Sequence, residues 1–209
     1  MISVAEAERL YDTADAVHDF DHVVRVLRLA ERIGTVEGAD MPVVRTAALL
    51  HDVGRLEAEK AGIDHAAAAA ERARQILARE PRELADAVCH AVAAHRYRSE
   101  PSPSTLEARV VFDADKLDAI GAVGVARAFA YGGAHDQRLW APVESVDVDR
   151  WLAYGDEGDT HTPVHEFVVK LSRIKDCLYT PTGQMIAAGR HDFVVSFFAR
   201  LEQEVREGA

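Results

Sequence analysis

The sequence contains little cysteine and no long hydrophobic run. Its two cysteines, Cys89 and Cys177, fall in helical patterns without paired spacing, so we expect a reducing, cytoplasmic compartment and no disulfide framework. The apolar runs are far shorter than the roughly 18 residues of a membrane-spanning helix. The first ten residues lack the basic and apolar regions of a secretory signal. These absences favour a cytoplasmic protein that acts away from the membrane.

Positive charge is also scarce. The chain has 24 lysine and arginine residues against 35 aspartate and glutamate residues, which gives a formal net charge of -11. Sequence-independent binding to nucleic acid relies on basic surface, so we expect no stable nucleic-acid complex. A local cationic pocket could still bind a small anionic substrate. Four of the 24 cations are lysines, at Lys60, Lys116, Lys170 and Lys175.

The sequence has no sustained alternation of apolar and polar residues, so no sheet is predicted. Apolar residues recur at three- and four-residue steps, which predicts an all-α protein. Gly34 is expected to end the first of these helices, and Pro42 suits the first turn of the next. The predicted helices cover about residues 19–34, 42–54, 66–79, 81–95, 105–131, 163–178 and 184–204.

One segment breaks the helical pattern for longer than the others. Residues 132–162 mix glycine, proline and acidic residues and contain both tryptophans. Loops of this length without secondary structure are often lids or binding loops. We therefore expect a long loop excursion that covers or borders a binding site.

The stretch LLHDVGRL, residues 49–56, joins an apolar run to polar residues. His51 and Asp52 follow two leucines, and Gly54 comes soon after them. A hydrogen-bonded polar pair near a helix end is one explanation. A histidine nitrogen and a carboxylate oxygen also suit a divalent ion such as Mn²⁺, Fe²⁺, Ni²⁺, Zn²⁺ or Mg²⁺. Such a site needs further ligands from elsewhere in the chain.

Two other predicted helices supply candidate ligands, His22 and Asp115. Asp115 shares a helix face with apolar residues, and a buried carboxylate needs a cation or several hydrogen bonds. Together with His51 and Asp52, these two residues would make a four-ligand site drawn from three helices. Such a site would leave room for water and a substrate.

The order of these residues, H…HD…D, resembles the HD-domain superfamily of metal-dependent phosphohydrolases. HDFDHVVRVLRLA, ALLHDVGR and FDADKLDAIGAVGVARAFAYGG are similar to three blocks of its small bacterial members. So is HEFVVKLSRIKDCLYTPTGQMIAAGRHDFVVSFF, and the four blocks cover most of residues 11–200. The dipeptide HD alone is common by chance, whereas four ordered blocks are a specific signal.

The resemblance implies a compact multi-helix HD-domain bundle, with one domain over residues 1–209 and a core at about 11–200. It implies that the four ligands named above hold one divalent metal ion (Mn, Fe, Ni, Co, Zn or Mg), and it leaves a second ion open. It also implies hydrolysis of a phosphate ester or anhydride, often in a nucleotide. Some similar members cleave nucleoside triphosphates to the monophosphate and pyrophosphate. The expected partner is a small phosphorylated molecule, and the oligomeric state stays unknown.

Four other histidines are candidates for roles near the metal. His95 lies on the apolar side of its helix, so it could contact phosphate, act as a general acid, bind a second metal or be a core residue. His90, about 140° away around the same helix, faces the polar side. His65 is a weaker second-metal candidate or a residue near a helix start. His18 lies four residues before His22. We expect it to contact a metal ligand without binding the ion, or to have no role in the site.

Cationic side chains near the metal would bind substrate phosphate. Lys116 directly follows a predicted ligand, and Lys170 and Lys175 lie in the fourth block. A lysine ammonium is a compact charge that suits a phosphoryl oxygen. Arg25 and Arg55 are further substrate-binding candidates, or members of ordinary ion pairs.

The leading hypothesis is a metal-dependent phosphohydrolase in which metal-activated water attacks phosphorus. Lys116 would stabilise the developing charge, and Asp118 or His95 would move the proton. Asp118 could also orient a metal ligand or a lysine, or could equally be a helix-surface charge. One rival is a regulatory module that binds metal and nucleotide without turnover. Another is a helical interaction protein in which these residues are only buried polar contacts.

Overall fold

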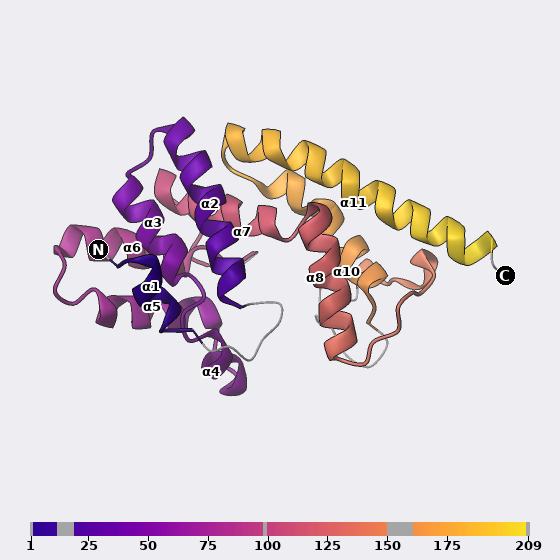
Figure 1. Cartoon of the computed structure of the whole chain (residues 1–209), viewed down its shortest axis with the longest axis horizontal. Helices are drawn as coiled ribbons and strands as arrows, with labels where there is room; N and C mark the ends of the chain where they lie inside the picture. The colour runs from indigo at the N-terminus through magenta and orange to yellow at the C-terminus, as the bar shows by residue number, and fades with distance from the viewer. Residues whose placement is uncertain (1, 12–18, 98–99, 150–160, 208–209) are drawn as a thin grey trace. The chain divides into compact units, whose positions relative to one another are not determined.

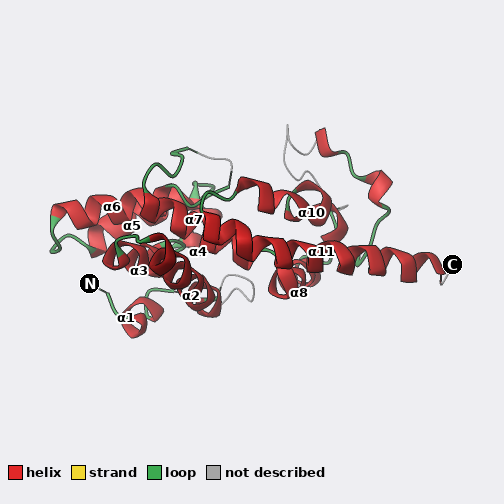
Figure 2. Cartoon of the chain, turned by 90° about the horizontal axis from the view of Figure 1, so that it is seen from above, coloured by secondary structure: helices red, strands yellow, loops and turns green. Residues whose placement is uncertain are grey.

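The computed structural model describes residues 2–11, 19–97, 100–149 and 161–207. Over these residues the chain is helical and has no strand, as Figure 2 shows, which confirms the predicted all-α class. The elements, whose α-helices are labelled in Figure 1, are α1 Val4–Glu8, α2 Phe20–Glu37, α3 Met41–Leu50, α4 Arg55–Lys60, α5 His65–Ile76, α6 Arg82–Ala93, α7 Leu106–Asp118, α8 Gly121–Ala134, the 3₁₀ helix η1 Val143–Ser145, α10 Pro163–Val169, the 3₁₀ helix η2 Leu171–Cys177, and α11 Pro181–Glu207.

The chain divides into two compact units. Unit 1 consists of Met1–Lys116 and Leu178–Gly183, and unit 2 consists of Leu117–Cys177 and Gln184–Ala209. The boundary therefore falls inside α7 and inside α11. The expectation of one domain over residues 1–209 stays a prediction.

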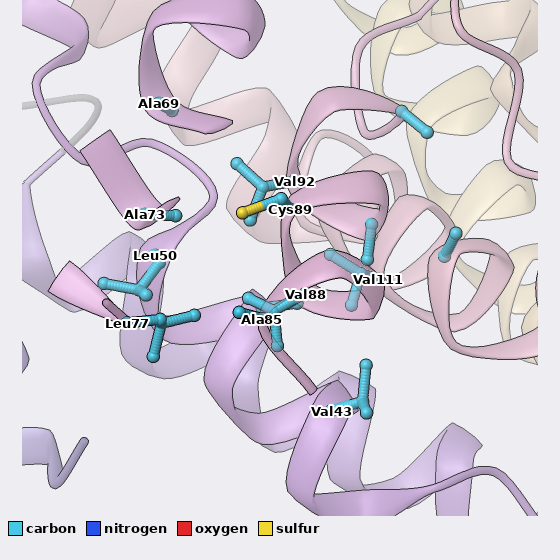
Figure 3. Packing of buried hydrophobic residues seen from close by; sticks show 14 of the residues in the cluster. Val43, Leu50, Ala69, Ala73, Leu77, Ala85, Val88, Cys89, Val92 and Val111 are labelled. Carbon is cyan, nitrogen blue, oxygen red and sulfur yellow. The ribbon is translucent and has the colours of Figure 1, made fainter. Parts of the chain in front are cut away.

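The core of unit 1 is shared by α3, α5, α6 and α7. Figure 3 shows side chains from these helices, among them Leu50 and Val88, meeting in one apolar cluster. Three alanines of α5, namely Ala66, Ala69 and Ala73, are buried at three- and four-residue steps. Their small side chains let the neighbouring helices approach closely. The alanine-rich stretch is therefore a packing face.

Helix α2 extends beyond the predicted end at Gly34. It continues to Glu37 and ends at Gly38, whose φ of 76° is in the left-handed region that favours glycine. Gly34 is buried inside the helix, and a Cβ there would lie 3.0 Å from the sulfur of Met41. The prediction was wrong because Gly34 permits close packing of α2 on α3.

The single helix predicted over residues 105–131 is divided into α7 and α8. The break lies at residues 119–120 and is followed by Gly121, whose φ is 79°. The Arg190 guanidinium donates to the Leu117 carbonyl, so a carbonyl near the end of α7 has a partner. Helical periodicity continues across the break, which is why the pattern alone did not reveal it.

The start of α11 belongs to unit 1 because carboxylates hold it there. Asp113, which is fully buried, accepts hydrogen bonds from the backbone amides of Tyr179 and Thr180 at 2.9 and 2.7 Å, and from the Thr180 hydroxyl at 2.7 Å. Glu37 accepts from the Thr182 amide at 2.8 Å. Negative groups at a helix N-terminus are stabilising because they complement the helix dipole and satisfy its free amides.

Unit 2 has a core rich in phenylalanine. Phe167 stacks on Phe198 with ring centroids 4.4 Å apart, and Phe129 contacts both Phe197 and Phe198. Helix α8 continues to Ala134, so the predicted loop excursion begins slightly later than residue 132. Its described part contains the short helix η1 and helical residues at 148–149, and residues 150–160 lie outside the described residues. Its role as a lid stays a prediction.

Candidate metal centre

The first turn of α2 places His22 in the interior of unit 1. Asp19 caps the helix, and its carboxylate accepts from the His22 backbone amide at 3.1 Å. His22 is 1% exposed and lies on the same buried helix face as Val23 and Val26. The helix start therefore directs an imidazole inward.

The end of α3 places His51 and Asp52 beside His22. Both side chains are buried, at 0% and 3% exposure. The His51 Nδ1 lies 2.8 Å from the Ala48 carbonyl, so this nitrogen carries the proton and Nε2 presents a lone pair. The His51 Nε2 is 3.2 Å from the His22 Nε2. The Asp52 Oδ2 is 3.7 Å from the ring nitrogen of His51 and 3.8 Å from that of His22.

Helix α7 adds Asp115 to this cluster. Its Oδ1 lies 3.4 Å from the His22 Nε2, and its Oδ2 pairs with the Lys116 ammonium at 2.5 Å. The four residues predicted as ligands thus lie together in unit 1. Three of them, His22, His51 and Asp52, offer ligand atoms that all lie within 4.8 Å of one another.

The chemistry of this cluster fits a divalent cation. Two imidazole nitrogens face each other at 3.2 Å, so either one ring donates its proton to the other or a cation lies between them. The buried Asp52 Oδ1 has no hydrogen-bond partner among the described residues. A buried carboxylate oxygen without a donor is costly unless a cation satisfies it. Nitrogen and oxygen donors together suit Mn²⁺, Fe²⁺, Ni²⁺, Co²⁺ or Zn²⁺.

A second group of possible ligands shares Asp52. Its Oδ1 is 3.5 Å from the His95 Nε2 and 4.0 Å from the His65 Nε2, distances at or beyond the outer limit of a hydrogen bond. The His95 Nδ1 lies 2.6 Å from the Val92 carbonyl, so its Nε2 also presents a lone pair. The ligand atoms of Asp52, His65 and His95 also all lie within 4.8 Å of one another, so this group could hold a metal ion as well. One carboxylate therefore faces both sets of histidines.

The pKa values in this region favour metal binding. Burial lowers the pKa of His51 to about 4 and that of His65 to about 3, so both rings are neutral at pH 7. Burial alone would raise the pKa of Asp52, but the Arg55 charge and the histidines outweigh it and keep that pKa well below its usual value. The same balance, with Lys116 as the main cation, holds the pKa of Asp115 well below its usual value. Neutral imidazoles and ionised carboxylates are the forms that bind metal ions.

Two of the predicted phosphate-binding cations are engaged with the ligand carboxylates. The Arg55 guanidinium bonds the Asp52 Oδ2 at 3.0 Å. The Lys116 ammonium bonds Asp115 and lies 5.4 Å from the centre of the Phe112 ring. Arg55 is therefore a member of an ion pair with Asp52, and its contact with substrate phosphate stays a prediction. Arg25, in α2, is half-buried, and its substrate contact stays a prediction.

The other predicted site residues have their own contacts in unit 2. Asp118 is 1% exposed and pairs with Arg127 at 2.8 Å, which excludes the surface-charge alternative. The Lys170 ammonium pairs with Glu166 at 2.7 Å. Lys175 is exposed and has no ion-pair partner among the described residues. Their catalytic and phosphate-binding roles stay predictions.

The remaining histidines separate as the helix periodicity indicated. His95 is 2% exposed and faces the cluster, whereas His90 contacts the loop residue Ser104, with 2.8 Å between its Nε2 and the hydroxyl. His18 lies outside the described residues. Sequence reasoning missed Asp113, although an acid directly after the apolar run VVF was an available signal.

Comparison with known proteins agrees with this geometry. The HD domain family matches residues 19–120, which include all four predicted metal ligands. YpgQ of Bacillus subtilis (strain 168) is 34% identical over 192 residues, which cover 90% of this chain and 84% of YpgQ. The chain belongs to the HD-domain superfamily.

Solved structures of this superfamily have the same fold. Bacillus subtilis YpgQ in complex with ADP is 31% identical, with a TM-score of 0.73 and coverage of 97% of this chain and 98% of that one. An HD-superfamily hydrolase from Bacillus thuringiensis is 27% identical, with a TM-score of 0.72 and coverage of 97% and 94%. The chain therefore has the fold of HD-superfamily hydrolases.

A partial likeness extends to a larger enzyme. Ribonuclease Y of Chloroflexus aurantiacus is 30% identical over 161 residues, but the matched part is only 30% of that protein.

None of the described helices is long and apolar enough to cross a membrane.

Proposed function

We propose that this protein is a divalent-metal-dependent phosphohydrolase that acts on nucleotides. The observation that carries the proposal is the buried cluster of His22, His51 and Asp52, with Asp115 beside it and an unsatisfied oxygen on Asp52. The HD-superfamily hydrolase fold supports the reaction class, and the ADP bound to YpgQ supports a nucleotide substrate. Cleavage of a nucleoside triphosphate to the monophosphate and pyrophosphate is the favoured reaction.

Each residue of the cluster has a distinct task in this proposal. His22, His51, Asp52 and Asp115 would hold the metal ion. When bound, the ion would lower the pKa of a water molecule and polarise a phosphoryl oxygen. Lys116, held at 2.5 Å from Asp115, keeps that carboxylate ionised and adds positive charge near the phosphate. Arg55 orients Asp52 through its 3.0 Å bond and is half-buried beside the cluster.

The proposal includes a second metal position formed by Asp52, His65 and His95. The support is that the His95 Nε2 and the His65 Nε2 face the Asp52 oxygen that lacks a hydrogen bond. His95 would then be a ligand rather than the residue that moves the proton. Metal analysis of the purified protein distinguishes one bound ion from two.

The test is a screen of phosphorylated substrates with different metals. Purified protein is incubated with nucleoside mono-, di- and triphosphates, generic phosphate esters and a short RNA, each with Mn²⁺, Ni²⁺, Co²⁺ or Mg²⁺. Measuring whether phosphate or pyrophosphate is released identifies the bond that breaks. We expect pyrophosphate from a triphosphate. Metal binding without turnover of any substrate would contradict the enzyme proposal.

The regulatory alternative predicts a different pattern. A non-catalytic HD module would bind metal and nucleotide with measurable affinity, but the nucleotide would be recovered intact. The helical interaction protein predicts no stoichiometric metal at all. Metal content and nucleotide recovery together separate the three readings.

A further inference from the structure

The side chain of Tyr11 reaches the end of α3, where the predicted metal ligands begin. Its hydroxyl donates a hydrogen bond to the Leu49 carbonyl at 2.9 Å. Leu49 lies two residues before His51. Tyr11 itself lies outside residues 19–120, the part of the chain that matches the HD domain family.

The hydrogen bond satisfies one of the carbonyls that a helix end leaves without a partner. Three consecutive carbonyls at the end of α3 each have a different partner. Ala48 is bonded by the His51 ring at 2.8 Å, Leu49 by Tyr11, and Leu50 by the Val53 amide at 3.2 Å. The first of these bonds sets which His51 nitrogen faces the cluster. The Tyr11 bond holds the carbonyl that follows.

Burial raises the pKa of the Tyr11 phenol well above its usual value, and the Asp52 charge adds to the rise, while a backbone hydrogen bond from Asp52 opposes it. The phenol is therefore neutral at pH 7 and remains a donor.

Tyr11 is held in place by the segment around α1. Ser3 and Glu6 form a capping box that starts this helix. Ala7 is fully buried, and Ile2, Leu10 and the Tyr11 ring pack against the core cluster of unit 1. The hydroxyl thus projects from an anchored segment and acts on the α3 end from a fixed position.

We infer that Tyr11 is a positioning residue for the metal centre, whose hydroxyl holds the α3 end so that His51 and Asp52 face His22. The inference rests on the proposed function, because it assumes that these residues bind a divalent ion. A ligand pair held in its binding geometry before the ion arrives loses less conformational freedom on binding. Removing the hydroxyl should therefore weaken metal binding.

The test compares Tyr11→Phe with Leu10→Ala. Tyr11→Phe removes the hydroxyl and keeps the ring that packs on the core, so it is expected to fold. Leu10→Ala is the matched control, because it removes core packing from the same segment and keeps the Tyr11 hydroxyl that bonds the Leu49 carbonyl. Mn²⁺ dissociation constants are measured by calorimetric titration, and the visible spectrum of bound Co²⁺ reports ligand geometry. Melting temperatures of the metal-free proteins report stability.

We expect Tyr11→Phe to weaken Mn²⁺ binding about fivefold to tenfold, the loss typical of one hydrogen bond, and to alter the Co²⁺ spectrum. Leu10→Ala should lower the melting temperature more and leave the Mn²⁺ affinity of the folded protein unchanged. Wild-type affinity and spectrum in Tyr11→Phe, or equal weakening in both variants, would overturn the inference. Failure of the proposed function is distinct, because the wild-type protein would then bind no Mn²⁺ or would bind it without hydrolysing any substrate, whereas this inference is tested by the difference in Mn²⁺ affinity between the variants.

Discussion

Units 1 and 2 both bury charged side chains, but they satisfy them in different ways. In unit 2, the buried Asp118 is paired with Arg127 and the partly exposed Glu166 with Lys170, and each pair comes from nearby residues of the sequence. In unit 1, side chains from α2, α3 and α7 converge, and the Asp52 Oδ1 still has no hydrogen bond among the described residues. The paired charges of unit 2 satisfy each other, and the buried atoms there that lack a hydrogen bond among the described residues, the Trp140 Nε1 and the His191 Nδ1, belong to uncharged or isolated rings. The charged groups of unit 1 require a further ligand, as expected of a binding site.

The sharpest test of this difference is Asp52→Ala in unit 1. The variant should lose metal-dependent hydrolysis, and its Mn²⁺ affinity should fall by at least about a hundredfold. Mutation of a residue that only hydrogen-bonds a metal ligand already lowers metal affinity by about 10- to 100-fold. His51→Ala should behave similarly. Helix content, measured by circular dichroism, should stay near that of the wild type in both.

His90→Ala is the matched histidine control, because His90 contacts Ser104 and faces away from the cluster. It should retain activity and metal affinity. Activity near the wild-type level in Asp52→Ala or His51→Ala would refute the assignment of the metal centre.

In unit 2 the largest expected effect is on stability. Arg127→Ala leaves the buried Asp118 carboxylate without its guanidinium partner. Removing one member of a buried ion pair lowers the free energy of unfolding by about 3 kcal/mol. Urea unfolding measures this loss, and the Mn²⁺ dissociation constant should not change.

The control for Arg127 is Arg200→Ala, which breaks the exposed pair with Glu204 on α11. Exposed pairs contribute less than about 1 kcal/mol. Equal destabilisation by the two variants would show that burial of Asp118 is not the cause.

Acid should affect the two units at different pH values. In the metal-free protein, the pKa of His51 is lowered to about 4 from its usual 6.5 by burial. The unfolded chain then binds more protons between these values, so stability falls as the pH drops from about 6.5 toward 4, by on the order of 3 kcal/mol. The pKa of Glu166 in unit 2 is held at about 2, because Lys170 and His161 outweigh the effect of burial. Its contribution is lost only below about pH 4.5.

Unfolding in urea at pH 7 and pH 5 measures this difference. Far-ultraviolet circular dichroism follows both units, whereas the fluorescence of Trp140, measured in a Trp151→Phe background, reports on unit 2. The dichroism midpoint should fall more at pH 5 than the fluorescence midpoint. His51→Ala should reduce that gap, and an unchanged gap would show that His51 does not cause it.

The smallest effect is expected at Lys175. It is exposed in η2, so Lys175→Ala should change the free energy of unfolding by less than about 0.5 kcal/mol. If Lys175 contacts substrate phosphate, steady-state kinetics should show a raised KM or a lowered kcat. Unchanged kinetics would remove Lys175 from the site and leave the metal centre untouched.

Much of this site was predictable because residue chemistry and order along the chain suffice to select it. His51 and Asp52 stand out where an apolar helix ends, and the family resemblance selects His22 and Asp115. Helical periodicity also separated His95 from His90 correctly. The end of α2 and the break before α8 were not predictable in this way, because Gly34 packs inside a helix while Gly121 adopts a left-handed conformation. Glycine thus allows close packing inside a helix at one position and a left-handed break between helices at another. Only the neighbouring residues in the fold decide which role it has.

The sequence by itself determined the all-α class and the helix faces, because these follow from local spacing. Side-chain chemistry singled out His51 and Asp52, and the family resemblance selected His22 and Asp115. Only the tertiary structure decided that Asp52 faces two sets of histidines, that Arg55 pairs with it, and that Tyr11 reaches the end of α3. These contacts join residues that are distant in sequence or lie around a turn. Their geometry depends on how whole helices pack, which no short stretch of sequence encodes.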